Sequence, residues 1–145
     1  MNAKNFFTKD QKLAIIKAIT QSELQTSGEI RLHIDSNCEV NVLDSATLIF
    51  RKLKMHKTEL RNGVLFYLAV TDKKFAILGD KGINEKVPEN FWDNIKELML
   101  DHFKKQQFTE GLCKGIEMAG EKLKTHFPLQ SNDTNEITNE ISIGN

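Results

Sequence analysis

The sequence predicts an α/β domain in which a small mixed β-sheet of three to four strands is sandwiched between helices, an α/β/α arrangement. The first observation is the order of its periodic segments, which reads helix, strand, helix, strand, strand, helix, helix. The second is that residues 64–70 are apolar throughout, as expected of a central strand covered on both faces. The third is a length of 145 residues, enough for one domain with a single core.

The first half of the chain is predicted to contain a helix, a strand and a second helix. Thr8 begins a capping-box pattern and apolar residues follow at helical spacing, which predicts a helix over residues 9–26. Residues 29–35 alternate polar and apolar side chains with a period of two, which indicates a strand. Asp44 is a candidate N-cap for a helix over residues 44–55.

The second half is predicted to contain a hairpin and two helices. A short polar turn after residues 64–70 leads into a second apolar run at 75–78, so these two strands are expected to pair antiparallel. Apolar side chains at helical spacing predict helices over residues 89–104 and 109–127, and Pro128 ends the last one. Three glycines in the last helix lower its helix propensity and are expected to permit close packing.

Residues 1–128 are predicted to form the single domain, and the polar residues 129–145 a disordered tail.

Composition and charge exclude several classes of protein. Twenty acidic and twenty basic side chains balance, which gives no electrostatic reason to expect a nucleic acid as partner. No apolar run is long enough for a signal peptide or a membrane span, so the sequence predicts a cytoplasmic protein without membrane insertion. Its two cysteines, without zinc-type spacing, are expected to be reduced.

The predicted topology gathers polar groups at one end of the sheet. A strand, helix and strand in succession make the first two strands parallel, and the hairpin makes the third antiparallel to both. Asp80, which follows the third strand, should therefore lie near Glu29 at the start of the first strand. The connection that carries Glu59 and Asn62 leads into the second strand at the same end, and Glu85 follows Asp80 in its loop.

These oxygen-bearing side chains suggest a site for a hard divalent cation. Calcium takes oxygen ligands from carboxylates, amides, backbone carbonyls and water. The sequence therefore predicts that one or two calcium ions bind to a set of five residues: Glu29, Glu59, Asn62, Asp80 and Glu85. The alternative is that neighbouring lysines and Arg61 neutralise these acids in ordinary solvated loops. Residues 79–82 lack the glycine patterns of phosphate-binding loops, so no nucleotide or other organic cofactor is expected.

Three other residues are weaker candidates for chemistry. His33 and His102 could each approach a metal, yet an isolated histidine is more often a structural or surface residue. Cys38 could be a catalytic thiol, but no histidine lies at motif spacing from it, so an inert cysteine is the simpler interpretation.

Four stretches together resemble the TPM domain, a family shared by a plant thylakoid-lumen protein, a photosystem-repair protein and a modulator of acetylcholine receptors. They are "TSGEIRLHI", "KLKMHKTELRNGVLFYLAV", "KKFAILGDKGINEKVPENFW" and "HFKKQQFTEGLCKGIEMAGEKLKTHFP", and the resemblance covers about residues 6–128. It is closest to the short bacterial members that consist of this domain alone. The "RNGVL" segment matches the family's Asn-Gly loop at Asn62, where relatives often have Asp in place of Arg61. Residues 79–82 match the Gly-x-Gly loop loosely.

The resemblance implies a small sheet between helices, and it brings two activities attributed to plant members, calcium binding and phosphatase activity. We therefore expect a non-enzymatic calcium-binding module whose metal-stabilised loops present a surface to an unidentified protein partner. The alternative is a metal-assisted phosphatase acting on phosphomonoesters, with Arg61 and Lys81 to hold the phosphate. A third possibility is an interaction domain that binds no ion.

Overall fold

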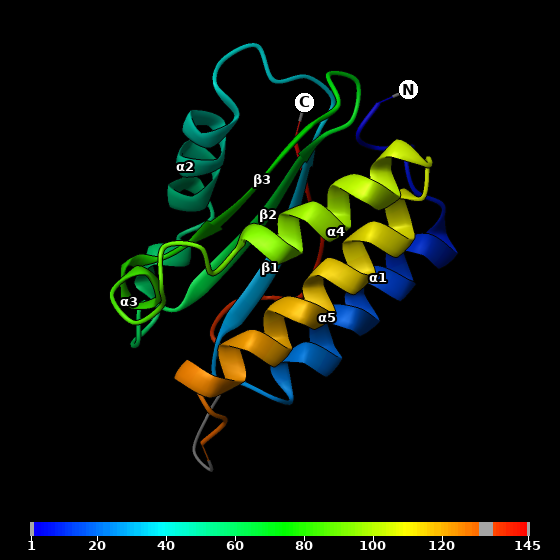
Figure 1. The fold of residues 1–145 in the computed structure, drawn as a ribbon. Coiled ribbons are helices and arrows are strands. Elements are labelled where there is room, and N and C mark those ends of the chain that lie inside the picture. The colour runs from blue at the N-terminus through cyan, green and yellow to red at the C-terminus, as the bar shows by residue number, and fades with distance from the viewer. Residues whose placement is uncertain (1, 131–134, 145) are drawn as a thin grey trace.

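A four-stranded mixed sheet forms the centre of the domain in a computed structural model, which describes residues 2–130 and 135–144 (Figure 1). The strand order is β3-β2-β1-β4, with β1 parallel to both of its neighbours and β3 antiparallel to β2. The strands are β1 (Glu29–Asp35), β2 (Gly63–Ala69), β3 (Lys74–Gly79) and β4 (Ser142–Ile143). The predicted α/β fold, the parallel first pair and the antiparallel hairpin are thereby confirmed.

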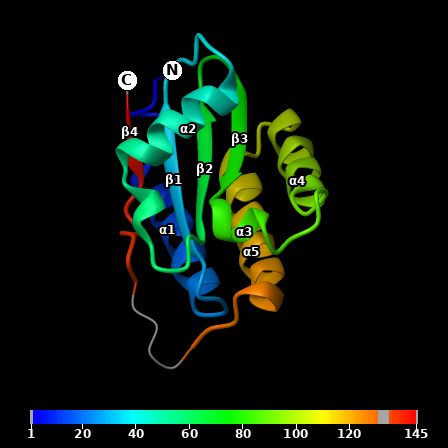
Figure 2. The ribbon, with the colours of Figure 1, turned by 90° about the vertical axis from the view of Figure 1, so that its left-hand side faces the viewer.

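Helices cover the two faces of the sheet unequally, as Figures 1 and 2 show. On one face lie α1 (Lys9–Glu23), α4 (Asp93–Lys104) and α5 (Phe108–His126), whereas α2 (Val42–Lys52) lies on the other. Two short helices, the 3-10 helix η1 (Met55–Lys57) and α3 (Lys81–Asn84), sit at the end of the sheet where β2 begins and β3 ends. Among the described residues, no helix is long and apolar enough to cross a membrane.

The central strand β2 explains why its sequence is apolar throughout. Val64, Phe66 and Leu68 enter the large core beneath α1, α4 and α5. The alternate residues Leu65 and Tyr67 enter a smaller core beneath α2. Successive side chains of a strand point to opposite faces, so covering both faces requires apolar residues at every position.

The ends of the helices follow local capping chemistry. The Thr8 capping box is present as predicted, with its hydroxyl accepting from the Gln11 N–H at 3.1 Å. The predicted cap of α2 is wrong: Asn41, not Asp44, caps it, because the Asn41 side chain reaches the Leu43 N–H at 2.8 Å. The helix predicted to begin at residue 89 begins at Asp93, after a series of turns.

Glycines in α5 allow close approach of the neighbouring helices. A Cβ atom at Gly115 would lie 2.6 Å from the Sδ atom of Met99 on α4, and one at Gly120 would lie 2.6 Å from the Cβ atom of Ser22 on α1. The close packing predicted for these glycines is confirmed. It sets α5 between α1 and α4 and closes the large core.

The C-terminal segment, residues 135–144, lies in the tail that was predicted to be disordered, and its residues Ser142 and Ile143 pair with β1. It runs along the outer edge of β1 and supplies the fourth strand that the sequence did not locate. Ile137 is 7% exposed in the smaller core. The remainder of the tail prediction for residues 131–134 and 145 lies outside the described residues. A segment with few apolar side chains is ordered here because the β1 edge supplies backbone hydrogen-bond partners.

Candidate functional site

The loops at the start of β2 and the end of β3 meet as the predicted topology requires. The Asp80 N–H donates to the Gly63 carbonyl at 2.9 Å, and Gly63 is the register partner of Glu29. Asp80, Asn62 and Glu29 therefore lie at the same end of the sheet. Sharing one end of the sheet does not bring their side chains together.

Asp80 is held by a cation of the chain itself. Its carboxylate accepts from the Arg61 guanidinium at 2.7 Å from Nε and 2.8 Å from Nη2. It also accepts from the Lys81 N–H at 2.7 Å, and so caps α3. The hydrogen bonds that Arg61 donates to Asp80 raise the pKa of Arg61 above its ordinary value. This bidentate geometry is the strong form of an arginine–carboxylate pair, so Asp80 performs a structural role in this loop.

The other predicted ligands point to separate places. Asn62 is 1% exposed, and its amide donates to the Ser27 carbonyl at 3.1 Å, which ties β2 to the connection before β1. Glu59 and Glu85 are exposed. Within residues 2–130 and 135–144, no three histidine, cysteine, aspartate or glutamate side chains form a group that could hold a metal ion.

A cavity of about 550 Å³ lies beside the Asp80 loop, between α2, the end of β3 and α3. Its walls include Arg51, Arg61 and Lys81 together with Asp80. His56 also lines it, and the His56 Nδ1 atom is buried without a hydrogen-bond partner in the described part of the chain. Glu85 is also part of the lining, so basic and acidic side chains both surround this cavity.

Glu29 belongs to a second region, at the start of β1. It is 4% exposed, and its carboxylate accepts from the Glu136 N–H at 2.6 Å and from the Ile137 N–H at 3.3 Å. These bonds fasten the C-terminal segment to the sheet. Glu29, which the sequence suggested as a ligand, thus also anchors the C-terminal segment.

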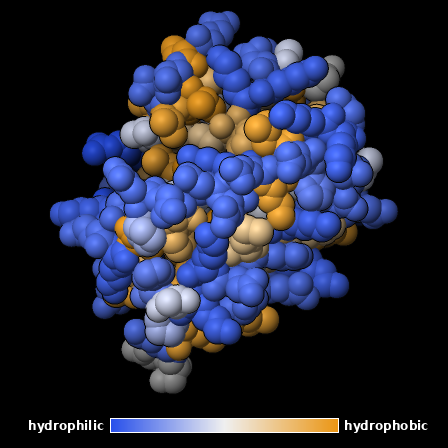
Figure 3. All heavy atoms as spheres, viewed as in Figure 1, coloured by the Kyte–Doolittle hydropathy of each residue, from blue (hydrophilic) through white to orange (hydrophobic). Residues whose placement is uncertain are grey.

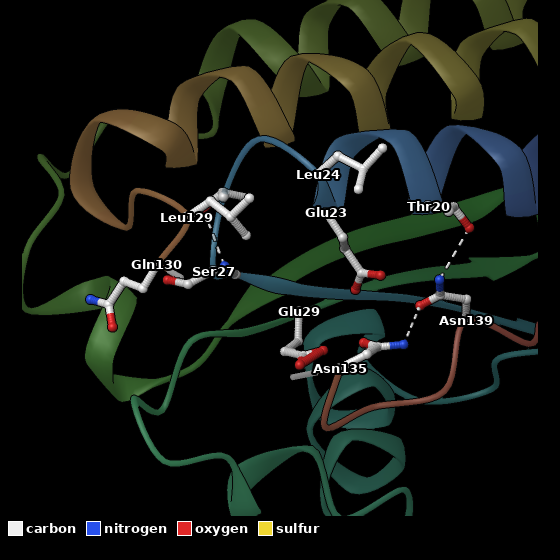
Figure 4. A pocket seen from close by; sticks show the side chains of 11 residues that line it. Thr20, Glu23, Leu24, Ser27, Glu29, Leu129, Gln130, Asn135 and Asn139 are labelled. Atoms are coloured by element: carbon white, nitrogen blue, oxygen red, sulfur yellow. Dashed lines mark hydrogen bonds between the residues drawn. The ribbon is translucent and has the colours of Figure 1, made fainter. Parts of the chain in front are cut away.

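A cavity of about 530 Å³ opens between the end of α1, the start of β1 and the C-terminal segment (Figure 4). Glu23 enters it from α1 and Glu29 from β1, with Asn135 and Asn139 on the facing wall. The Asn139 amide donates to the Thr20 hydroxyl at 3.1 Å, and the Asn135 amide donates to the Asn139 side-chain oxygen at 3.3 Å. We call this space the acidic cavity.

Glu23 is the residue of this cavity that sequence reasoning missed. Burial raises the pKa of Glu23 from 4.5 to about 7, and the negative charge of Glu29 adds to the rise. The Ile30 N–H, which donates to Glu23 Oε2 at 3.0 Å, and the Asn139 side chain act in the opposite direction. Its position could have flagged it, because a carboxylate in the last turn of a helix opposes the helix dipole, and that turn of α1 holds no basic side chain.

The two histidines and the cysteine named from sequence have structural partners. His33 Nε2 lies 2.8 Å from Asp35 Oδ1, and His33 Nδ1 lies 2.8 Å from the Ser142 hydroxyl. The Tyr67 hydroxyl donates to the other Asp35 oxygen at 2.7 Å. Burial lowers the pKa of His33 and raises that of Tyr67. These side chains therefore form a buried network beneath the C-terminal segment.

Cys38 and His102 sit in similar local roles. The Cys38 thiol lies 3.2 Å from the Ser45 hydroxyl and 3.3 Å from the Val40 carbonyl. His102 Nδ1 lies 2.9 Å from the Leu98 carbonyl one helical turn earlier. Each side chain serves to hold its own loop or helix.

Comparison with protein families decides the relationship. The family model of the TPM domain matches residues 1–122. This chain belongs to the TPM domain family. A comparison with curated protein sequences finds no match.

Solved structures of other TPM-like proteins share the fold. The BA42 protein of the psychrophilic bacterium Bizionia argentinensis is similar, with 45% sequence identity, a TM-score of 0.92 and 97% of each chain covered. The N-terminal domain of a protein from P. gingivalis has 16% identity and a TM-score of 0.70, with 85% of this chain and 80% of that chain covered. The N-terminal domain of a Corynebacterium glutamicum protein has 11% identity and a TM-score of 0.65, covering 89% and 79%. The latter two show the fold alone.

Proposed function

We propose that this TPM domain is a non-enzymatic module that binds a divalent cation, most simply calcium, in the acidic cavity. The single observation that carries the proposal is the convergence of two carboxylates, the half-buried Glu23 and the buried Glu29, on one space of about 530 Å³. Two negative charges that share a poorly solvated cavity repel each other, and a bound cation relieves that repulsion. Burial is the main cause of the raised pKa of Glu23, and the negative charge of Glu29 adds to the rise.

The chemistry of the cavity suits calcium. Calcium accepts six to eight oxygen ligands in flexible geometry, including carboxylates, amide oxygens and water. Glu23 and Glu29 offer the charge, while Asn135, Asn139 and Ser27 line the same cavity with neutral oxygen atoms. Because Asp80 already has Arg61 as its partner, we place one ion here rather than in the loop of residues 79–86.

A cation in this place would act on the structure around it. The acidic cavity joins α1, β1 and the C-terminal segment, three parts of the chain that are distant in sequence. Bound calcium would hold them together, and the surface that a protein partner meets would include residues 135–144. This keeps the function expected from the sequence, a metal-stabilised interaction module, and moves its site.

A calcium titration tests the proposal. Calcium that binds only the native state raises the melting temperature, by an amount that corresponds to about 2.7 kcal/mol when calcium is at a hundred times its dissociation constant. We expect Glu23→Gln and Glu29→Gln to lose that rise, with backbone amide shifts confined to the ends of α1 and β1 and to residues 135–140. The matched control is Asp80→Asn, which should keep it.

Two results would overturn this proposal. Melting curves that do not move in millimolar calcium would exclude binding of useful affinity. A rise that disappears in Asp80→Asn and persists in Glu29→Gln would return the site to the loop that the sequence indicated.

One observation favours the phosphatase alternative: His56 Nδ1, in the cavity beside Asp80, has no hydrogen-bond partner among the residues that the structure describes. In that case Arg51 and Lys81 would hold the phosphate, and a metal ion would polarise it and activate water. Hydrolysis of a generic phosphomonoester in the presence of magnesium, manganese or calcium tests this candidate. We expect His56→Gln to abolish such activity without loss of folding, and an absence of turnover with every metal would exclude the candidate.

A further inference from the structure

A third hollow lies at the opposite end of the domain from the Asp80 loop, between the β2–β3 hairpin and the junction of α4 and α5. It has a volume of about 260 Å³. Its walls are mainly apolar, and we call it the phenylalanine pocket. The side chains that form it include Phe6, Phe75, Leu100, Phe103 and Phe108.

The aromatic walls of this pocket support one another. The ring centroids of Phe75 and Phe103 are 5.1 Å apart at an interplanar angle of 85°, and those of Phe6 and Phe108 are 5.2 Å apart at 74°. Phe103 and Phe108 connect the two pairs at 5.4 Å. Edge-on contacts at these distances are favourable, so the pocket is preformed by rings from four separate parts of the chain.

The mouth of the pocket exposes apolar surface to water. Leu100 on α4 is 43% exposed at this mouth. Figure 3 shows apolar side chains gathered in a hollow over β3 and the neighbouring part of α4, with hydrophilic residues around it. A contiguous apolar surface with a polar rim is typical of a binding site, because leaving it in water costs free energy.

The charged part of the lining has one sign. The residues of the lining that the structure describes include Lys73, Lys74 and Lys104, and none of them is acidic. The Lys74 ammonium donates to the Cys38 carbonyl at 3.0 Å and is thereby engaged on the hairpin side. Lys73 and Lys104 are exposed and stand on the hairpin and on α4 respectively. An anionic group at the mouth would be attracted from both sides.

We infer that the phenylalanine pocket binds a small amphiphilic carboxylate, with its hydrocarbon chain among the phenylalanines and its carboxylate between Lys73 and Lys104. The occupant must be small, since the volume lies just below the roughly 300–1,000 Å³ that is usual for pockets of drug-sized ligands. Apolar walls supply affinity, and the two ammonium groups select the charge of the head group.

The probe is decanoate, used below the concentration at which it forms micelles, with decan-1-ol and decyltrimethylammonium as neutral and cationic counterparts. We expect decanoate to shift the backbone amides of residues 73–75 and 100–108 in two-dimensional NMR spectra of the full chain. A surface ion pair is worth up to about 1 kcal/mol, so we expect the alcohol to bind roughly fivefold more weakly and the cation more weakly still.

Two variants localise the site. Leu100→Asp places a charge at the apolar mouth and should abolish binding, whereas Leu48→Asp, at a leucine of α2 that is 68% exposed, should leave it unchanged. Lys73→Glu combined with Lys104→Glu should weaken binding at least tenfold, and the matched pair Lys9→Glu with Lys17→Glu on α1 should not.

Three outcomes would overturn the inference. They are the absence of any decanoate-dependent shift, equal affinity for decanoate and decan-1-ol, and shifts that persist in Leu100→Asp. Folding of each variant is checked by its amide spectrum, so a loss of binding is separated from a loss of structure. The test is independent of calcium, because the acidic cavity shares no lining residue with this pocket.

Discussion

Asp80 and Glu29 are buried carboxylates at the same end of the sheet, 7% and 4% exposed, and the chain treats them differently. Asp80 receives two hydrogen bonds from the guanidinium of Arg61. Glu29 receives two from backbone N–H groups of the C-terminal segment and shares its cavity with Glu23. One region therefore places a full positive charge against its acid, while the other uses partial charges.

Burial is the largest cause of the rise in the pKa of Glu23 to about 7, and the uncancelled charge of Glu29 adds to it. Backbone N–H groups stabilise a carboxylate through hydrogen bonds, but they do not cancel the repulsion between two carboxylates as a cation does. The Asp80 loop is held by an ion pair within the chain. In the acidic cavity, the cation that we propose would supply the positive charge, and four predictions test this comparison.

The largest expected effect is the pH dependence that Glu23 imposes. Its pKa is 4.5 in the unfolded chain and about 7 in the native state, so the native state binds the proton more tightly. The resulting stability is fully present below pH 4.5 and is lost as the pH rises through about 7. At about 1.4 kcal/mol per pKa unit, Glu23→Gln should exceed the wild type in free energy of unfolding by up to roughly 3 kcal/mol above pH 7.

Urea unfolding at a series of pH values measures this effect. The two free energies of unfolding should converge near pH 4, and saturating calcium should remove most of the wild type's loss at high pH. Glu121→Gln, at an exposed glutamate of α5, serves as the control, and its free energy of unfolding should depend on pH as that of the wild type does. If the free energy of unfolding of Glu23→Gln also followed that of the wild type at every pH, Glu23 would be an ordinary solvated acid.

A slightly smaller effect is expected from Gly82→Ala, which attacks the Asp80 loop. A Cβ atom at Gly82 would overlap the carbonyl oxygen of Leu60 and lie 2.6 Å from that of Arg61. The two loops would have to separate, at a cost of about 2 kcal/mol in the free energy of unfolding. Urea unfolding checks this cost: the midpoint concentration should fall while the dependence of the free energy of unfolding on urea concentration stays the same.

The control for Gly82→Ala is Gly28→Ala, near the acidic cavity. Its added Cβ atom would meet the Leu123 side chain at 3.2 Å, and a side chain can yield where a backbone carbonyl cannot. We expect it to cost less than about 1 kcal/mol. Equal losses in the two variants would argue against the tight joint that distinguishes the Asp80 loop.

Asp80→Ala should have a moderate effect because it removes the cap of α3 along with the partner of Arg61. Loss of a helix cap costs about 1 kcal/mol. Asp80→Asn keeps a capping oxygen and removes only the charge, so its stability should lie between that of Asp80→Ala and that of the wild type. Thermal unfolding of the three proteins ranks them, and a loss in Asn as large as that in Ala would assign the whole effect to the ion pair.

The smallest effect is expected from Asn139→Ala, which sharpens the description of the acidic cavity. The Asn139 side chain lowers the pKa of Glu23, so its removal should raise that pKa slightly further. An NMR titration of the Glu23 side-chain carboxyl carbon records the change. Asn90→Ala, at an exposed position far from the cavity, should give the wild-type titration, and a lowered pKa in Asn139→Ala would contradict the assigned contact.

Sequence patterns predicted the elements well where one local rule governed them. The capping box at Thr8 and the continuous apolar run of β2 were interpreted correctly, because both depend on residues adjacent in the chain. The cap at Asn41 was missed in favour of Asp44, because only the backbone conformation shows where the helix begins. The short helix α3 was missed because one turn of helix carries too little periodicity to detect.

The candidate site was harder to predict because it depends on which partner each acid reaches. Asp80 and Glu29 were correctly placed at one end of the sheet, since strand directions determine this. Neutralisation of the acids by Arg61 was only one of two alternatives in the sequence. The pairing of Arg61 with Asp80 depends on a left-handed backbone conformation at Arg61, with φ of 51°, which the residue type does not predict. Glu23 gave only the weak signal of an acid at the end of a helix.

By itself, the sequence determined the order and character of the elements, the direction of the strands and the family to which the chain belongs. These follow from periodicity and short connections, which are properties of neighbouring residues. Only the tertiary structure decided that residues 135–144 complete the sheet and that Glu23 and Glu29 face one cavity. Burial and charge pairing arise between segments more than 100 residues apart, as in the contact of Glu29 with Glu136, and local patterns carry no record of such distances.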